Sequence, residues 1–358
     1  MERKLNFNAG PAALPDTVLL QAADAVKEYK NTGLSILELP HRGSEFAAII
    51  AESKELVKEL CGIDDNYEVL WLQGGGRLQF AMIPMNFASE FSSAGYIDSG
   101  HWAEEASEYA AYYGDMHVLS SSKAVRYNRL PDWPVEIPKQ LAYLHITTNN
   151  TIYGTQWHNI PDANVPLIAD MSSDIFSRQG DYNKYALFYA AAQKNLGAAG
   201  TALVVVRKDL LKRIVRPIPP MLNYNEQVKE DSILNTANVF GVYTSLLMLR
   251  WIKEKGIRNI EEENKQKAET LYAALDESKV FKPYVLEQTH RSLMNVCFTA
   301  NTAEQEQAFL ALCAANNITG IKGHRSVGGF RVSLYNAIPL SSVTKLVAVI
   351  KEFETLQA

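Results

Sequence analysis

The stretch FYAAAQKNLGAAGTALVVV, residues 188–206, places a lysine between two apolar runs that are typical of short buried strands bounded by glycines. Lysine is almost never fully buried unless it is paired, so Lys194 is not expected on an ordinary solvated face. Three explanations are open. The charge of Lys194 is paired with an opposite charge, the side chain extends toward water, or the amine has a chemical function at this position. Which of the three applies depends on the groups that the neighbouring strands bring beside it.

The first two-thirds of the chain alternates between helical and strand-like patterns. Helical periodicity covers residues 17–30, 45–61, 78–87 and 239–255, with Asp16 and Ser44 suited to cap helix starts and Gly62 and Gly256 suited to end helices. Strand-like runs cover residues 67–73, 94–98, 117–120, 141–147, 166–170, 187–192 and 202–206. The alternation predicts an α/β fold whose mostly parallel, seven-stranded sheet has helices on both faces.

The residues after Gly256 have a different character. A charged helical pattern over 258–278 is followed by two strand-like runs, a helix near 303–316, a strand at 329–336 and a final amphipathic helix. We expect this part of the chain to form a smaller α/β domain.

The composition excludes several classes of protein. The chain has 358 residues, of which 47% are hydrophobic and 21% are charged, so a large core is expected and disorder is not. A formal net charge of −5 argues against broad nucleic-acid binding. Cys61, Cys297 and Cys313 have no CxxC spacing, which fits a reducing compartment and no structural metal. Because neither a signal-type stretch nor a run of about 18 apolar residues is present, we expect a cytoplasmic protein without membrane segments.

Polar groups at the ends of the predicted strands fit a single ligand, since ligands of open α/β sheets bind at the carboxyl ends of strands. WLQGGGR ends a strand just before a helix, where free N–H groups suit a phosphate, although three glycines alone are more typical of a tight turn. Asp170 ends the run PLIAD 24 residues before Lys194, although a lone aspartate there usually caps a turn. Trp102 follows another strand and either stacks on a flat cofactor or packs in the core. A phosphate-binding turn, an aspartate and a Schiff-base lysine are the groups that pyridoxal phosphate needs.

Two His-Arg pairs are candidates for binding anions. His41 and Arg42 precede a predicted helix, and His324 and Arg325 lie in a glycine-rich loop before the strand that carries Arg331. Arginine binds carboxylate and phosphate with two hydrogen bonds, and a neighbouring histidine adds charge near neutral pH. Most surface arginines are simply solvated, so the informative feature is the pairing inside glycine-bounded loops.

These stretches, together with FNAGPAALP, ADMSSDIFSR and RSLMNVCF, resemble the phosphoserine aminotransferases, a family in the class V subgroup of fold-type I pyridoxal-phosphate aminotransferases. The likeness runs nearly end to end, and HRG with GHRSVGGFR is specific to this family. The resemblance implies a large domain over residues 16–257 and a small domain formed by residues 1–15 and 258–358. It also implies a homodimer with active sites at the subunit interface.

The resemblance further implies a reversible transamination between L-glutamate and 3-phosphohydroxypyruvate, which gives O-phospho-L-serine and 2-oxoglutarate in serine biosynthesis. The similar phosphorylated keto acid of vitamin B6 synthesis, on the pyridoxine pathway, is a second conceivable substrate. Lys194 would form the Schiff base and move the proton, and Asp170 would hold the pyridine nitrogen protonated.

The remaining matching residues receive binding roles by the same resemblance. Trp102 would stack on the cofactor ring, and Thr151 would bond the ring hydroxyl. The other expected cofactor ligands are Gly76, Arg77, Gln193 and, from a second subunit, Asn235 and Thr236. The expected substrate ligands are Arg77, His324, Arg325, Arg331 and, from the second subunit, His41 and Arg42.

Three positions depart from the family pattern without removing any side chain that has a role. Leu78 replaces a small residue after GGGR, Asn150 replaces an acidic one, and NTAN (235–238) lacks the usual prolines. We expect Leu78 to alter the shape of the phosphate end and NTAN to alter the stiffness of its loop.

Other functions remain open at this point. One is a different class V enzyme, such as an alanine–glyoxylate aminotransferase or a cysteine desulfurase. The desulfurase needs a reactive loop cysteine, whereas Cys297 lies in a strand-like run and Cys313 in a helical one. Another is a non-catalytic anion-binding protein of the α/β class, which the missing nucleotide fingerprint disfavours.

Overall fold

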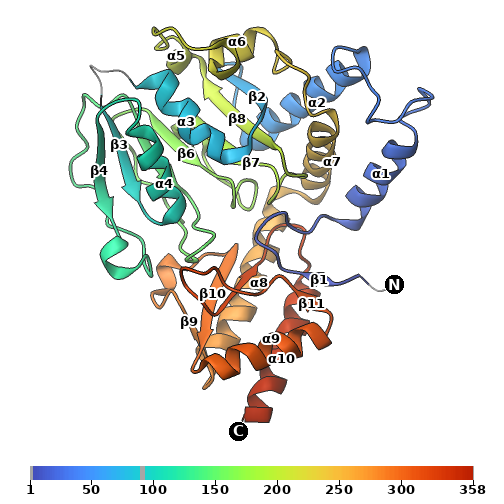
Figure 1. Ribbon diagram of the computed structural model, residues 1–358, viewed down its shortest axis with the longest axis vertical. Helices are drawn as coiled ribbons and strands as arrows, with labels where there is room; N and C mark the ends of the chain where they lie inside the picture. Colours follow the sequence, from blue (N-terminus) through green and yellow to red (C-terminus); the bar gives the residue numbers. More distant parts are fainter. Residues whose placement is uncertain (1–2, 89–92, 358) are drawn as a thin grey trace.

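Residues 3–88 and 93–357, which the computed structural model describes, contain a central sheet of seven strands in the order β2-β8-β7-β6-β5-β3-β4 (Figure 1). The strands are β2 (Tyr67–Gln73), β3 (Ala94–Asp98), β4 (Met116–Ser121), β5 (Leu144–Thr147), β6 (Leu167–Asp170), β7 (Leu187–Ala191) and β8 (Thr201–Arg207). Neighbours from β7 to β4 are parallel, whereas β8 is antiparallel to both β7 and β2. The predicted α/β fold with a mostly parallel sheet is therefore confirmed.

Helices cover both faces of this sheet, which explains why its inner strands are continuous apolar runs. One face packs against α1 (Asp16–Lys27), α2 (Ser44–Cys61) and α7 (Val239–Lys255). The other face packs against α3 (Gly75–Phe87) and α4 (His101–Ala110), with the short α5 (Lys208–Leu211) and α6 (Tyr224–Lys229) nearby. Along β8, Val205 belongs to the first core and Val204 and Val206 to the second, as strand alternation requires.

The helices predicted to follow Asp16 and Ser44 are present, but each begins one residue earlier than predicted, at Asp16 and at Ser44, so the predicted caps are wrong. Within the described residues neither helix has a side-chain cap, because Pro15 and Gly43 occupy the capping positions. Asp16 pairs instead with Arg3. The predicted stop of α2 is confirmed, since Gly62 adopts a left-handed conformation with φ of 60° that costs glycine little.

The C-terminal part of the chain forms a smaller body below the sheet (Figure 1). Its described residues build an antiparallel sheet of three strands, β9 (Phe281–Pro283), β10 (Asn295–Ala300) and β12 (Phe330–Ser333). Around it lie α8 (Ile257–Asp276), α9 (Ala303–Ala315) and α10 (Leu340–Gln357). Near the other end of the chain, β1 (Leu5–Asn6) pairs in parallel with β11 (Ile318–Thr319), so the first described residues pack with the last hundred.

In the described part of the chain, no helix has both the length and the apolar composition needed to cross a bilayer.

We predict that Phe281→Ala destabilises the smaller body by about 3–5 kcal/mol, since the fully buried ring contacts four other aromatic rings. Its neighbours are Phe298, Phe309, Phe330 and Phe353, at centroid distances of 4.7–5.8 Å. Urea unfolding followed by circular dichroism measures the loss. Leu356→Ala, at a side chain that is 68% exposed, is the control and should change the free energy of unfolding little. A loss below about 1 kcal/mol for Phe281→Ala would contradict the prediction.

Candidate active site

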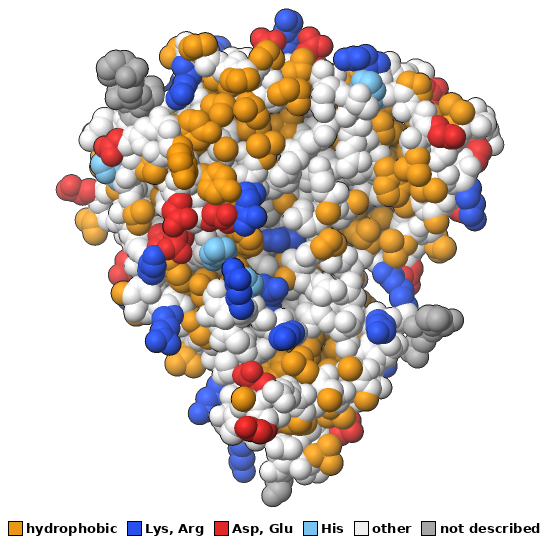
Figure 2. Space-filling view, in the orientation of Figure 1, with side chains coloured by type: hydrophobic (Ala, Val, Ile, Leu, Met, Phe, Trp, Pro, Cys, Tyr) orange, Lys and Arg blue, Asp and Glu red, His pale blue; other side chains and the backbone are white. Residues whose placement is uncertain are grey.

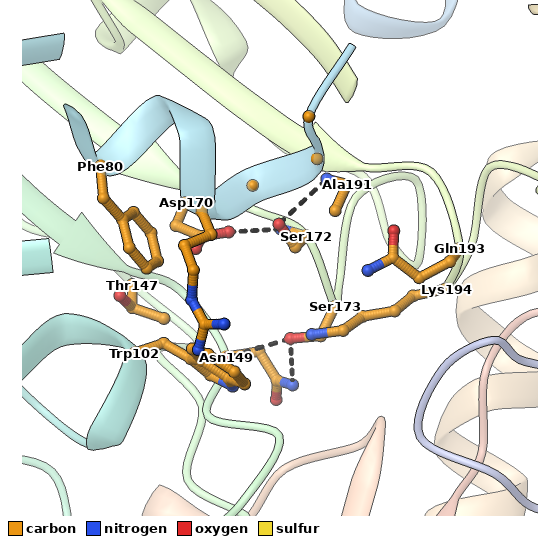
Figure 3. Close-up of a pocket in the computed structure, with 14 residues that line it drawn as sticks. Phe80, Trp102, Thr147, Asn149, Asp170, Ser172, Ser173, Ala191, Gln193 and Lys194 are labelled. Carbon is orange, nitrogen blue, oxygen red and sulfur yellow. Dashed lines mark hydrogen bonds between the residues drawn. The ribbon is translucent and has the colours of Figure 1, made fainter. Parts of the chain in front are cut away.

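A cavity of about 220 Å³ opens where β6 and β7 end and α3 begins (Figure 3). Several predicted site residues from distant parts of the chain meet in it. Those that line it are Gly76, Arg77, Trp102, Asp170, Gln193 and Lys194, together with Gly74, Gly75, Phe80, Thr147, Asn149, Ser172, Ser173 and Ala191. The expected meeting of strand ends at one edge of the sheet is confirmed by this lining.

Lys194 lies in the turn after β7 and points into the cavity (Figure 3). Its Nζ donates a hydrogen bond to Thr151 Oγ1 at 2.8 Å. Burial lowers the pKa of Lys194 to about 8. The negative charge of Asp170 opposes this shift, and the positive charge of Arg331 adds a smaller lowering. The neutral, nucleophilic amine is therefore accessible close to neutral pH.

Asp170 is the last residue of β6 and is buried at the far wall of the cavity. Its Oδ1 accepts a hydrogen bond from the backbone N–H of Ser172 at 2.8 Å, and Ser172 Oγ accepts one from the N–H of Ala191 at 3.0 Å. Burial raises the pKa of the Asp170 carboxyl, opposed by the charge of Lys194. No ion pair of Asp170 occurs within the described ranges, so a protonated ring nitrogen in the cavity suits it as a partner.

The glycine turn closes the upper side of the cavity. Gly74 and Gly75 have φ values of +88° and +64°, which other residues rarely adopt. A Cβ on Gly76 would lie 3.3 Å from Ser172 Oγ, so glycine leaves the backbone open to a close ligand. The first N–H groups of α3 have no partner within the helix and suit a phosphate.

Trp102, at the start of α4, forms another wall. Its ring lies under the guanidinium of Arg77, at 5.4 Å from the centroid. Arg77 in turn donates to Glu105, with Nε–Oε1 and Nη2–Oε2 distances of 2.9 and 3.0 Å. Trp102 lines the cavity and is only partly buried, which favours the stacking interpretation over a core position.

A cluster of cationic side chains lies at the mouth of the cavity, on the smaller body. Figure 2 shows Lys, Arg and His side chains gathered near the middle of this face. Arg331 on β12 donates from Nη1 to the carbonyl of Thr151 at 3.4 Å, while its buried Nε has no partner among the described residues. The His324 ring lies 6.2 Å from that of His101. Burial, followed by the charges of Arg331, His101 and Arg325, lowers the pKa of His324, so without a bound anion this histidine adds less positive charge near neutral pH than its pairing with Arg325 predicts.

Comparison with known families and structures shows the family to which a chain with this cavity belongs. Residues 4–346 match the family model described as Aminotransferase class-V. The chain belongs to the class-V aminotransferases. It is 46% identical over 356 residues to the phosphoserine aminotransferase of Geobacillus kaustophilus, with 99% of each chain covered.

Solved structures extend this likeness. The phosphoserine aminotransferase from Bacillus circulans subsp. alkalophilus superimposes with a TM-score of 0.97 at 42% identity and covers 100% of both chains. A pyridoxal-phosphate-bound phosphoserine aminotransferase from Trichomonas vaginalis has a TM-score of 0.93 at 33% identity, covering 98% of this chain and 100% of that one. This class-V aminotransferase therefore has the fold-type I structure, and its cofactor is pyridoxal 5′-phosphate.

The cavity of this class-V aminotransferase fits that cofactor. Trp102 Nε1 and Gln193 Oε1 are buried polar atoms without a partner in the described part of the chain. Unpartnered groups of this kind are costly unless a ligand completes them. The glycine turn suits the phosphate, Asp170 suits the ring nitrogen, and Lys194 suits the aldehyde carbon.

The lining of the cavity does not include eight of the predicted residues. Thr151 bonds Lys194, and Arg331, His324 and Arg325 form the adjoining cluster, whereas the other four have no such link among the described residues. His41 and Arg42 lie just before α2, and Asn235 and Thr236 lie before α7. The carbonyl of Thr236 accepts a hydrogen bond from Gln73 Nε2 at 3.0 Å. These are the residues that were expected to come from a second subunit, and that expectation stays a prediction.

The departures from the family pattern do not line the cavity of the described chain. Leu78 packs beside Gly74, where a Cβ would come within 2.5 Å of it, and lies on the outer side of the turn. Asn150 Nδ2 donates to Ser99 Oγ at 3.2 Å and to Thr155 Oγ1 at 2.9 Å. The amide thus joins the loop of Thr151 to the residues that precede α4.

Sequence reasoning missed a polar layer under the cavity. Asn149 Nδ2 donates to Ser173 Oγ and to Asn295 Oδ1, each at 2.8 Å. Asn149 and Ser173 each follow a strand end by no more than three residues, which is the one signal that the sequence offers for them.

The cysteines are unsuited to desulfurase chemistry. Cys297 and Cys313 are buried, and burial raises the pKa of each thiol to about 12. A reactive cysteine needs an exposed, acidified thiol.

We predict that the amine of Lys194, in the protein freed of its cofactor, titrates near pH 8 rather than near 10.5. The rate of cofactor capture should rise with pH and level off above about 8, because only the neutral amine attacks. Asp170→Asn should lower the midpoint, since the carboxylate that favours the charged amine is gone. Stopped-flow absorbance measures the rate, with Lys212→Ala as a control. A midpoint near 10 in the unaltered protein would contradict the role of burial.

Proposed function

We propose that this class-V aminotransferase catalyses reversible amino transfer between L-glutamate and 3-phosphohydroxypyruvate, giving O-phospho-L-serine and 2-oxoglutarate in serine biosynthesis. The observation that carries the proposal is the cluster of Arg331, His324, Arg325 and Arg77 at the mouth of the Lys194 cavity. Each substrate has an α-carboxylate and a second anionic group at its other end. The relatives at about 45% identity over the full length carry the name phosphoserine aminotransferase.

Arg331 is suited to the α-carboxylate that all four compounds share. It lies on a strand, and its bond to the Thr151 carbonyl fixes the guanidinium beside the loop that also holds Lys194. A rigid element keeps the α-carbon in a constant position relative to the cofactor ring. The unpartnered Nε leaves a donor for the second carboxylate oxygen.

The distal anion differs between the substrates, being a carboxylate in glutamate and a phosphate in phosphoserine. His324 and Arg325 lie in the loop between β11 and β12, and His41 and Arg42 would join them from a second subunit. A doubly charged phosphate gains more from added cations than a carboxylate does. This loop is therefore the part of the site that favours the phosphorylated substrate.

Lys194 and Asp170 divide the proton chemistry. When bound, pyridoxal phosphate supplies an electron sink that stabilises the charge left at the α-carbon. The neutral Nζ of Lys194 takes the α-proton and returns a proton on the next step, and Thr151 orients the amine between these steps. The Asp170 carboxylate would accept a hydrogen bond from the ring nitrogen and would so keep that nitrogen protonated.

The proposal includes a two-fold homodimer, the commonest closed assembly. Hydrophobic side chains are exposed on and near α1, and Figure 2 shows such side chains on that flank of the molecule. Leu20 and Leu37 are 66% and 62% exposed. A second subunit seated there would cover this surface and supply the groups near α2 and α7 that lie outside the cavity of their own chain.

Cellular location and domain division belong to the same proposal. We infer a cytoplasmic enzyme whose large domain comprises residues 16–257 and whose small domain comprises residues 1–15 and 258–358. Residues 1, 2 and 358 of the small domain lie outside the described part of the chain. The packing of β1 against β11 supports the inclusion of the N-terminal segment.

We predict that Arg331→Lys impairs both half-reactions equally, by roughly 2–3 kcal/mol, because lysine cannot form the paired bonds to a carboxylate. His324→Ala should slow the phosphoserine half-reaction more than the glutamate one, since only the former brings a phosphate. Single-turnover spectroscopy of each half-reaction measures both variants. Equal losses in the two half-reactions for His324→Ala would refute the assignment of this loop to the phosphate.

We predict that mixing Lys194→Ala with Arg42→Ala subunits under exchange conditions restores activity, because one site of the mixed dimer receives both intact groups. Mixing Lys194→Ala with Asp170→Asn is the matched control. Both of these residues come from one chain, so neither site of that mixed dimer is complete. No recovery in the first mixture, despite demonstrated exchange, would argue against a shared site.

A further inference from the structure

We propose that Tyr189 and His145 are positioning residues for Asp170. In this arrangement His145 donates a hydrogen bond to the Tyr189 hydroxyl, and that hydroxyl donates its own proton to the Asp170 carboxylate. The inference rests on the proposed assignment of Asp170 to the ring nitrogen of the cofactor. It adds two side chains to the machinery that keeps that nitrogen protonated.

The geometry of the sheet brings the three side chains together. Asp170 on β6 and Tyr189 on β7 are direct neighbours in the parallel register, so their side chains leave the same face of the sheet. His145 lies on β5, the other neighbour of β6, and its Nε2 is 3.0 Å from Tyr189 Oη. All three side chains are buried.

Packing fixes the tyrosine ring in this position. A Cβ on Gly76 would lie 3.8 Å from Tyr189 Cε2, so the ring lies directly beneath the glycine turn. Phe80, which lines the cavity, meets the ring edge-on at a centroid distance of 6.4 Å. The Tyr96 ring stacks on His145 at 5.0 Å from the other side. These contacts hold the rings of Tyr189 and His145 in place.

The direction of the hydrogen bonds follows from the neutral state of His145. Burial lowers the pKa of His145 to about 3, so the ring carries one N–H. Its Nδ1 is buried with no partner among the described residues. A proton on Nδ1 would leave a buried N–H donor without an acceptor. With the proton on Nε2 instead, only the lone pair of Nδ1 has no partner, which costs less. Nε2 therefore donates to Tyr189.

The tyrosine hydroxyl then has one proton left to donate. In the proposed arrangement that proton goes to Asp170, the register partner of Tyr189 across the β6–β7 pairing. Burial raises the pKa of Tyr189, and the charge and hydrogen bonding of Asp170 raise it further, so the phenol keeps its proton. The other titratable groups that face Tyr189 are the hydroxyls of Tyr96 and Tyr224. In this relay of hydrogen bonds, from His145 to Tyr189 and from Tyr189 to Asp170, the donor to the Asp170 carboxylate is thus the neutral hydroxyl of Tyr189.

A neutral donor is what this carboxylate needs. Burial alone favours the protonated acid, and a protonated Asp170 could not hold a proton on the ring nitrogen. The backbone N–H of Ser172 supplies one hydrogen bond to the ionised form. In the proposed arrangement, the Tyr189 hydroxyl supplies another. Neither brings a positive charge that would compete with the ring nitrogen.

The test uses the holoenzyme and two readouts besides activity, which are the dissociation constant of pyridoxal phosphate and the midpoint of the pH titration of its visible absorbance. Tyr189→Phe should weaken cofactor binding about three- to tenfold. It should also raise the midpoint by several tenths of a pH unit. Without the phenol, the carboxylate draws the proton away from the ring nitrogen, and a less positive ring leaves the lysine-linked nitrogen more basic.

Matched variants separate this role from a structural one. His145→Phe should shift the midpoint in the same direction, and His145→Gln, whose amide can donate, should restore part of it. Tyr143→Phe is the control, because it removes a buried hydroxyl pair with Tyr96, at 2.8 Å on the same face of the sheet. That variant should lower stability and leave the midpoint unchanged.

Two outcomes distinguish failure of this inference from failure of the proposed function. If Asp170→Asn leaves cofactor affinity and midpoint unchanged, the assignment of Asp170 is wrong and the relay loses its purpose. If Asp170→Asn shifts both but a folded Tyr189→Phe shifts neither, the relay alone is overturned. Adding Tyr189→Phe to Asp170→Asn should produce no further shift, and full additivity would also overturn the relay.

Discussion

Parallel pairing of β6 with β7 is the constraint on which the site depends. It places Asp170 at the end of one strand and lets the next strand lead directly into Lys194. Both groups are thereby held away from water. Burial lowers the pKa of the amine and raises the pKa of the carboxyl, so each group loses its charge more easily than it would in water. These opposite pKa shifts suit a cofactor that forms a covalent bond with the Lys194 amine and a hydrogen bond with the Asp170 carboxyl.

Side-chain amides connect the smaller body to the loops at the end of this sheet. Asn295 on β10 bonds Asn149 beneath the cavity, and the N–H of Asn336 donates to Asn195 Oδ1 at 3.1 Å, next to the lysine. Arg331 reaches the Thr151 carbonyl from β12. Directional bonds between buried groups set the distance from the cationic cluster to the lysine more sharply than apolar packing would.

Most of the sheet could be predicted because strands buried on both faces are apolar runs of the right length. The bounds of β2, β3 and α7 match the predicted ranges. The helix α4 was missed, since the residues it buries are the small Ala103, Ala106 and Ala110, which recur on one face of the helix but are only weakly hydrophobic. The helix caps were misplaced by one residue, because the sequence does not reveal whether a polar residue precedes the first turn or begins it.

The residues of the candidate site could be predicted where a charged side chain stands next to an apolar stretch of sequence. A lysine among apolar strands and an aspartate at a strand end are visible in the sequence. Tyr189 and His145 are not, because an amphipathic ring inside a strand resembles an ordinary core residue until its polar atom is located. Asn149 and Asn295 lie 146 positions apart, and no local pattern connects them.

The reversed direction of β8 has a consequence for how the chain assembles. Lys194 lies in a hairpin connection between β7 and β8, not in a helical crossover. Among the described strands of the central sheet, this pairing joins segments that are closest in sequence, so it closes at the smallest cost in chain entropy. Hairpins form within microseconds, whereas parallel neighbours need a crossover to fold first. The loop that carries the lysine is therefore closed by pairing that is local in sequence, whereas Arg331 of β12 contacts the Thr151 carbonyl across 180 positions of the chain.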